Sequence, residues 1–167
     1  SKKSCRDVLM ENHYVITTRG LTKHYGAIRA IDSLNLDVRQ GEVFGFLGPN
    51  GAGKTTTIRI LLDMVRPTKG SAQVFGLDVR RDSVHIRRRL GNLPGEVALY
   101  DTLKGIDVLK LLGSFHGPLG TVRVSELAER LSLDLSRTVR AYSYGMKQKL
   151  AIIQAFMHDP ELLILDE

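Results

Sequence analysis

The sequence predicts an α/β fold, because apolar strands alternate with helical patterns along the chain. Continuous apolar runs at 42–47 and 162–165 indicate buried strands. Apolar residues recur at helical spacing over 58–65, directly after a glycine-rich stretch at 48–53. This order of strand, loop and helix is typical of an α/β domain.

The remaining elements follow from local patterns in chain order. β-Branched and aromatic residues predict a strand at 14–18, and alternation of apolar and polar residues predicts another at 34–38. Pro67 is expected to end the helix that follows the glycine-rich stretch. A strand at 70–74 and a basic helix at 80–89 come next.

The middle third is predicted to be helical, with apolar residues at helical spacing over 102–115 and 125–131. Another helix is expected at 146–158. Asp159 and Pro160 should end it before the apolar strand at 162–165.

Length and composition fit a single folded domain. The chain has 167 residues, against roughly 100 to 200 for a typical domain. Its 43% hydrophobic and 25% charged residues exclude a disordered or fibrous chain. A lone cysteine and scattered histidines predict neither an internal disulfide nor a metal cluster, and favour a reducing, cytoplasmic setting. Because no stretch reaches the roughly 18 to 20 apolar residues of a membrane span, any membrane connection is expected to run through a partner.

Residues 48–55 read Gly-Pro-Asn-Gly-Ala-Gly-Lys-Thr and match G-x-x-x-x-G-K-[ST] between a predicted strand and a predicted helix. Glycines let backbone N–H groups approach phosphates closely, and a helix N-terminus adds partial positive charge. The motif therefore predicts a triphosphate site in a P-loop nucleoside triphosphate hydrolase fold. Lys54 is expected at the β- and γ-phosphates, and Thr55 at Mg²⁺.

Two carboxylates, Asp166 and Glu167, follow the apolar strand at 162–165. Ligands of open α/β sheets bind at the carboxyl ends of strands. An apolar strand ending in Asp-Glu is by itself usually structural, but the P-loop makes a functional role the better interpretation. Asp166 is predicted to hold Mg²⁺, and Glu167 to orient and polarise the attacking water.

A third motif makes a family resemblance specific. Residues 143–150 read Ser-Tyr-Gly-Met-Lys-Gln-Lys-Leu, shortly before the apolar strand and the Asp-Glu pair. The chain resembles an ATP-binding cassette (ABC) domain, in particular the variants of ABC-2 type exporters, whose signature often reads Ser-x-Gly-Met. The resemblance covers about 14–167.

The resemblance implies that residues 1–167 are the N-terminal part of one cassette. It implies an antiparallel N-terminal β layer, a nucleotide-binding core at about 14–94 and 146–167, and a helical subdomain at about 95–145. It further implies that a switch histidine lies beyond Glu167, so the chain as given is expected to bind ATP but to hydrolyse it poorly.

Site roles also follow from the resemblance. Tyr25 would stack on adenine, while Ser143 and Gly145 would meet the ATP of a second copy in a head-to-tail dimer. Gly95 and Glu96 stand in the lid loop. There the family usually has Gln directly after the proline that is Pro94 in this sequence. The implied nucleotide-binding residues are Tyr25, Gly48, Pro49, Asn50, Gly51, Ala52, Gly53, Lys54, Thr55 and Thr56.

The predicted function is that of an ATPase subunit that drives transport of a substrate through a transmembrane permease, at the inner face of the membrane. Lys54 and Glu167 are the expected catalytic residues. The alternative is a soluble cassette ATPase acting on nucleic acid or ribosomes. It is disfavoured because the segment between Lys54 and Asp166 has room for a helical subdomain and little else. The arginines of 80–89 lack interleaved aromatics, so no nucleic-acid partner is expected.

Overall fold

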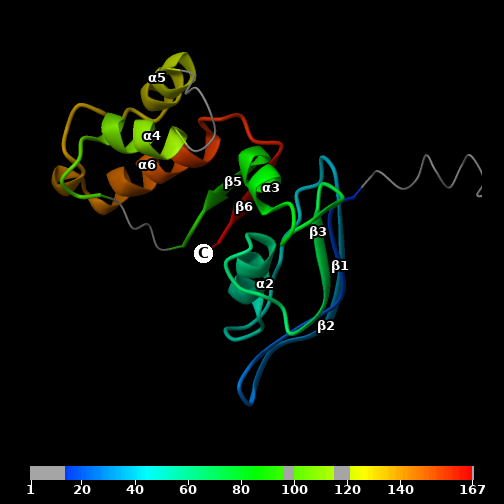
Figure 1. Cartoon of the computed structure of the whole chain (residues 1–167). Helices are drawn as coiled ribbons and strands as arrows, with labels where there is room; N and C mark the ends of the chain where they lie inside the picture. Colours follow the sequence, from blue (N-terminus) through cyan, green and yellow to red (C-terminus); the bar gives the residue numbers. More distant parts are fainter. Residues whose placement is uncertain (1–13, 96–99, 115–120, 167) are drawn as a thin grey trace, which may run out of the picture. The chain divides into compact units, whose positions relative to one another are not determined.

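A computed structural model of the chain describes residues 14–95, 100–114 and 121–166 (Figure 1). The chain divides into two compact units, the first ending at Ile86 and the second beginning at Arg87. Each unit contains its own β-sheet.

The sheet of the first unit has four antiparallel strands in the order β2-β1-β3-β4. The strands are β1 (Tyr14–Tyr25), β2 (Ile28–Arg39), β3 (Lys69–Val74) and β4 (Leu77–Asp78). The predicted antiparallel N-terminal layer is therefore confirmed. β1 and β2 extend well beyond the predicted 14–18 and 34–38, because their backbone pairing continues through polar residues as far as Tyr25 and Ile28.

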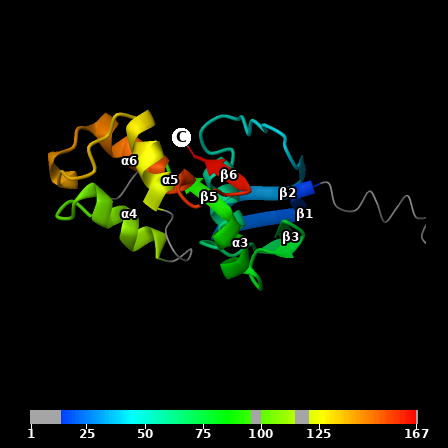
Figure 2. The ribbon, with the colours of Figure 1, turned by 90° about the horizontal axis from the view of Figure 1, so that it is seen from above.

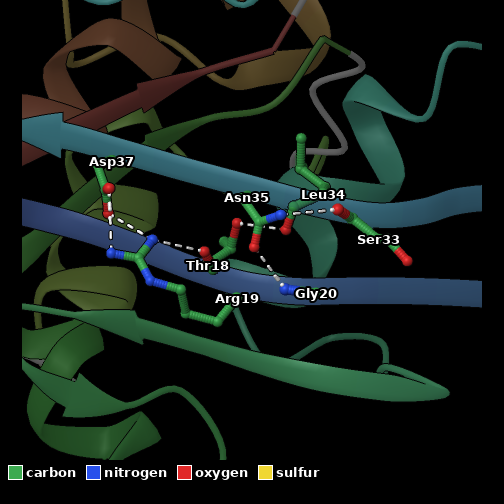
Figure 3. Close-up of polar contacts among 7 residues, drawn as sticks. All are labelled: Thr18, Arg19, Gly20, Ser33, Leu34, Asn35 and Asp37. Carbon is green, nitrogen blue, oxygen red and sulfur yellow. Dashed lines mark hydrogen bonds and ion pairs between the residues drawn. The ribbon is translucent and has the colours of Figure 1, made fainter.

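Polar side chains hold the register of β1 against β2 (Figure 3). Arg19 and Asp37 form a two-point ion pair, with Nη1 and Oδ1 2.7 Å apart and Nη2 and Oδ2 3.1 Å apart. The ladder shifts register between Thr18 and Leu21, and there the Gly20 amide donates to Oδ1 of Asn35 at 2.8 Å. The hydrogen bond satisfies an amide at the irregular point of the ladder, which fixes the hairpin.

The predicted strand at 42–47 is wrong. Within the described residues no segment forms a β-ladder with 42–47, and Val43 and Leu47 are 101% and 92% exposed. A strand needs a neighbour for its N–H and C=O groups, and apolar composition does not supply one.

Helix α2 (Lys54–Leu61) follows the glycine-rich loop as predicted, and it buries Thr57, Ile60 and Leu61. It ends at Leu61, earlier than Pro67 would require, because the Asp63 amide closes a tight turn onto the Ile60 carbonyl at 3.0 Å. Helix α3 (Ser83–Arg89) begins later than the predicted 80–89. Asp78 Oδ1 accepts the amides of Arg80 and Arg81 at 3.0 and 3.1 Å, and this holds them in a turn before the helix.

The sheet of the second unit pairs β5 (Leu90–Leu93) with β6 (Leu162–Leu165) in parallel. Helices α4 (Gly105–Gly113), α5 (Thr121–Arg130) and α6 (Tyr144–Phe156) and the short 3₁₀ helix η1 (Val139–Ala141) complete it. Each long helix confirms a predicted one, with shifted ends. None of the helices within the described ranges is long and apolar enough to cross a membrane.

The three long helices of the second unit share one hydrophobic core, and both views show them grouped together (Figures 1 and 2). Its most deeply buried members are Val108, Leu109, Val124, Val139, Leu150 and Ile153. Helix α6 contributes to this core, so it packs with the predicted helical subdomain. The predicted domain boundaries, about 95 and 145, remain a prediction.

Candidate functional site

The glycine-rich loop is anchored to β2 through Gly53. This residue is the N-cap of α2 and has a left-handed backbone, with φ at 87°. A Cβ at position 53 would collide with the Ala30 carbonyl oxygen and would lie 3.1 Å from Cγ1 of Ile31. The backbone conformation and the close approach both require glycine here. The start of α2 is therefore held against one point of the sheet.

The N-terminus of α2 suits an anion. Its first intrahelical bond runs from the Thr57 amide to the Gly53 carbonyl at 2.8 Å, and no side chain caps the helix. The first turn carries no acidic residue. The amides that start a helix sit at the positive end of its dipole, which favours a negatively charged ligand.

The predicted lysine lies over the same loop. The Lys54 ammonium donates to the carbonyl oxygens of Gly48 and Pro49, the latter at 3.1 Å. Thr55 and Thr56 are half-buried in the first turn of α2. Thr57 is buried, and its Oγ1 donates to the Gly53 carbonyl at 2.9 Å. Backbone amides, a helix N-terminus and a cation thus converge on one loop, and this set fits the phosphates of a nucleotide.

Tyr25 is the last residue of β1, and its side chain is 43% exposed. The Lys23 ammonium lies 4.8 Å from the centre of its ring. Lys23 was missed by sequence reasoning, although residues two apart on a strand share a face. Lys23 pairs with Ile31, which flanks Gly53, so Tyr25 lies roughly 7 Å farther along the hairpin from the point that anchors the loop.

The signature residues lie at the N-terminus of α6. Ser143 is the N-cap, and its Oγ accepts the Met146 amide at 3.3 Å. Tyr144 is 76% exposed, and its hydroxyl oxygen accepts a hydrogen bond from the Gln148 side-chain amide at 2.9 Å. A Cβ at Gly145 would meet no atom within 4 Å, and its φ is not left-handed. Packing within the described part of the chain therefore does not require glycine at position 145.

Asp166 and Gly95 lie at one edge of the second unit's sheet. β5 and β6 run parallel, with Leu93 opposite Leu165, so their carboxyl ends coincide. The Asp166 amide continues the pairing by donating to the Leu93 carbonyl at 3.0 Å. Glu96 and Glu167 lie outside the described residues. Within the residues that are described, no group of three or more His, Cys, Asp and Glu side chains forms a metal cluster.

The predicted site residues thus fall into three groups. Tyr25 and the loop residues up to Thr56 belong to the first unit. Asp166 and Gly95 share a sheet edge in the second unit, and Ser143 and Gly145 share the start of α6.

Comparisons with known proteins agree with these features. The ABC transporter family profile matches residues 31–167. The chain is 41% identical over 155 residues to the bacitracin transport ATP-binding protein BcrA of Bacillus licheniformis, covering 92% of this chain and 51% of the relative. It is 44% identical over 158 residues to the daunorubicin resistance ATP-binding protein DrrA3 of Streptomyces coeruleorubidus, covering 91% of this chain and 50% of the relative.

A solved structure, that of the ATP-binding subunit of an ABC transporter, has a TM-score of 0.83 and 30% identity to this chain. The match covers 92% of this chain and 66% of that one. The chain spans about half the length of the curated relatives it matches.

Proposed function

Since the chain belongs to the ABC transporter family, we propose that it binds and hydrolyses ATP to drive export of a substrate through a membrane partner. The predicted P-loop fold and the ABC assignment hold, whereas the activity of the whole protein is the proposal. The observation that carries it is the loop at 48–53, anchored by Gly53 and covered by Lys54.

The first unit would bind the nucleotide. The loop amides and Lys54 would hold the β- and γ-phosphates, because phosphoryl transfer needs positioning and charge neutralisation more than covalent chemistry. Tyr25 would stack on adenine, since its ring is exposed near the anchored loop. Residues 14–94 and 146–167 would form the nucleotide-binding core, with the helical subdomain between them.

Thr55 and Asp166 would hold Mg²⁺, because hydroxyl and carboxylate oxygens are ligands that this ion prefers. When bound, Mg²⁺ supplies positive charge against the β- and γ-phosphates. Glu167 would orient and polarise the attacking water, and Gly95 and Glu96 would line the lid loop.

Ser143 and Gly145 would contact the ATP held by a second nucleotide-binding domain. The open space around Gly145 supports this role, because an exposed helical glycine costs stability without any benefit to packing inside the chain. The other partner would be a transmembrane permease, with the chain at the cytoplasmic face of the membrane. The names of the bacitracin and daunorubicin relatives support an exporter.

Calorimetry with MgATP tests the proposal. We expect Lys54→Ala to weaken binding at least about tenfold, because a cation facing the phosphates contributes roughly 1.5–3 kcal/mol. Lys69→Ala is the matched control, since Lys69 is an exposed lysine on β3 of the same unit. Thermal unfolding of each variant reports whether the fold is kept. Unchanged MgATP affinity in Lys54→Ala would show that the loop is not the phosphate site.

A further inference from the structure

We propose that Asp101 and Lys147 are positioning residues, which together hold the signature turn in place. The signature turn is defined here as residues 143–145. The inference rests on the proposed function, in which this turn acts on the ATP of a second copy. The observation behind it is an ion pair between Lys147 Nζ and Asp101 Oδ1 at 2.8 Å.

Asp101 belongs to a segment that is hydrogen-bonded along its length to the segment preceding the signature turn. The Arg140 amide donates to the Asp101 carbonyl and the Val139 amide to the Leu103 carbonyl, both at 2.9 Å. The Gly105 amide in turn donates to the Arg137 carbonyl at 3.1 Å. Backbone hydrogen bonds therefore join residues 101–105 to residues 137–140, and the ion pair extends that connection to the start of α6.

Lys147 lies one helical turn after Ser143, and its amide donates to the Ser143 carbonyl at 3.0 Å. A cation in this place is unfavourable, because the N-terminus of a helix carries partial positive charge. Helix α6 has no acidic residue in its first turn. Asp101 supplies the missing negative charge from another segment, so it offsets the helix dipole and neutralises Lys147.

The pair is half-exposed, since the Lys147 side chain is 31% exposed and the Asp101 side chain is 55% exposed. Pairs of this kind contribute little to global stability. Both partners are nevertheless fixed by backbone hydrogen bonds, so the pair acts locally on where the first turn of α6 lies. Its loss should loosen the signature turn without unfolding the protein.

Lys149 provides a matched control. It lies two residues farther along α6, where a 3.6-residue period puts it on a different face from Lys147. Lys149→Gln removes the same charge from the same helix and leaves the Asp101 pair intact.

Hydrogen exchange on the full-length protein without nucleotide gives the first test. We expect the Met146 and Lys147 amides, which both bond to Ser143, to exchange about two- to fivefold faster in Asp101→Asn and Lys147→Gln. Lys149→Gln should exchange like the parent. If Asp101→Asn and Lys147→Gln also exchange like the parent, the pair does not hold the turn and the inference is wrong.

Steady-state ATPase kinetics of the full-length protein give the second test. Asp101→Asn and Lys147→Gln should lower kcat by about two- to fivefold with little change in KM for ATP, because the loop that binds ATP lies elsewhere in the chain. The double variant Asp101→Lys with Lys147→Asp should recover kcat. Equal kcat values in Lys147→Gln and Lys149→Gln, or no recovery in the double variant, would overturn the inference. A parent that hydrolyses no ATP would instead overturn the proposed function, whatever the exchange data show.

Discussion

Gly53 packs against the backbone carbonyl of Ala30 so closely that position 53 has no space for a Cβ. The contact joins the loop before α2 to strand β2, and it determines where the helix starts. Gly51, two residues earlier, has a similar left-handed backbone at φ 84° but open space around it. Comparing substitutions at these two glycines therefore separates the cost of backbone strain from the cost of a steric collision.

We predict that Gly53→Ala destabilises the protein more than Gly51→Ala does. Gly51→Ala should cost about 1–2 kcal/mol, the usual penalty for a side chain in the left-handed region. Gly53→Ala adds the collision with Ala30, so its cost should exceed that range, and MgATP affinity should fall with it. Urea unfolding of both variants measures the difference. Equal losses of stability would contradict the close contact.

Tyr25→Ala should weaken ATP binding about fivefold or more and leave pyrophosphate binding unchanged, since an exposed ring stacks on the base alone and stacking contributes roughly 1–3 kcal/mol per base. Calorimetry with both ligands provides the measurement. Tyr25→Phe should bind ATP like the parent, because it keeps the ring. Tyr14→Ala is the control, as Tyr14 is a similarly exposed tyrosine at the opposite end of β1. A parallel loss of both ligands in Tyr25→Ala would exclude stacking.

Gly105→Ala should destabilise the second unit, because a Cβ there would collide with the hydroxyl of Tyr142. That hydroxyl donates to the Asp134 carbonyl at 2.7 Å, so Tyr142→Phe alone should cost about 1–3 kcal/mol by leaving the carbonyl without its donor. The double variant, Gly105→Ala with Tyr142→Phe, lacks the colliding oxygen. Its loss of stability should therefore be smaller than the sum of the losses in the two single variants. Denaturant unfolding of the four proteins tests this, and strict additivity would contradict the contact.

Arg89 and Glu161 should make stability depend on acidic pH. Their side chains form a two-point ion pair, with Nε and Oε1 2.6 Å apart and Nη2 and Oε2 2.8 Å apart. The hydrogen bonds from Arg89 hold the pKa of Glu161 below its ordinary value of 4.5. A carboxyl whose pKa is lowered in the folded state stabilises the protein at pH values above the pKa that the group has in the unfolded state. That contribution is lost as pH falls through the folded value.

The stability difference between the parent and Glu161→Gln should therefore be present at neutral pH and shrink below about pH 4.5. Denaturant midpoints measured across this range give the comparison. Glu129→Gln, on the exposed side of α5, should show no such trend. A difference that stays constant down to acidic pH would show that the ion pair has no role in stability.

Local patterns alone determined much of this protein. Apolar spacing over a few turns predicted α2, α4, α5 and α6, because helical hydrogen bonds and side-chain faces depend on near neighbours in the chain. The loop at 48–55 was also predictable from the sequence, since its glycines, lysine and threonine lie within one short segment. The α/β class followed from these segments, and the resemblance carried by residues 143–150 implied the antiparallel layer and the ABC family. All three proved correct.

Only the tertiary structure decided what depends on distant segments. β1 reaches Tyr25 because β2 supplies backbone partners that far, whereas the more apolar segment 42–47 has no ladder within the described ranges. Gly53 must be glycine because of Ala30, and Lys147 has a role because of Asp101, each a contact between residues far apart in sequence. Sheet pairing, steric collision and ion pairing act through space, so no local pattern in the sequence records them.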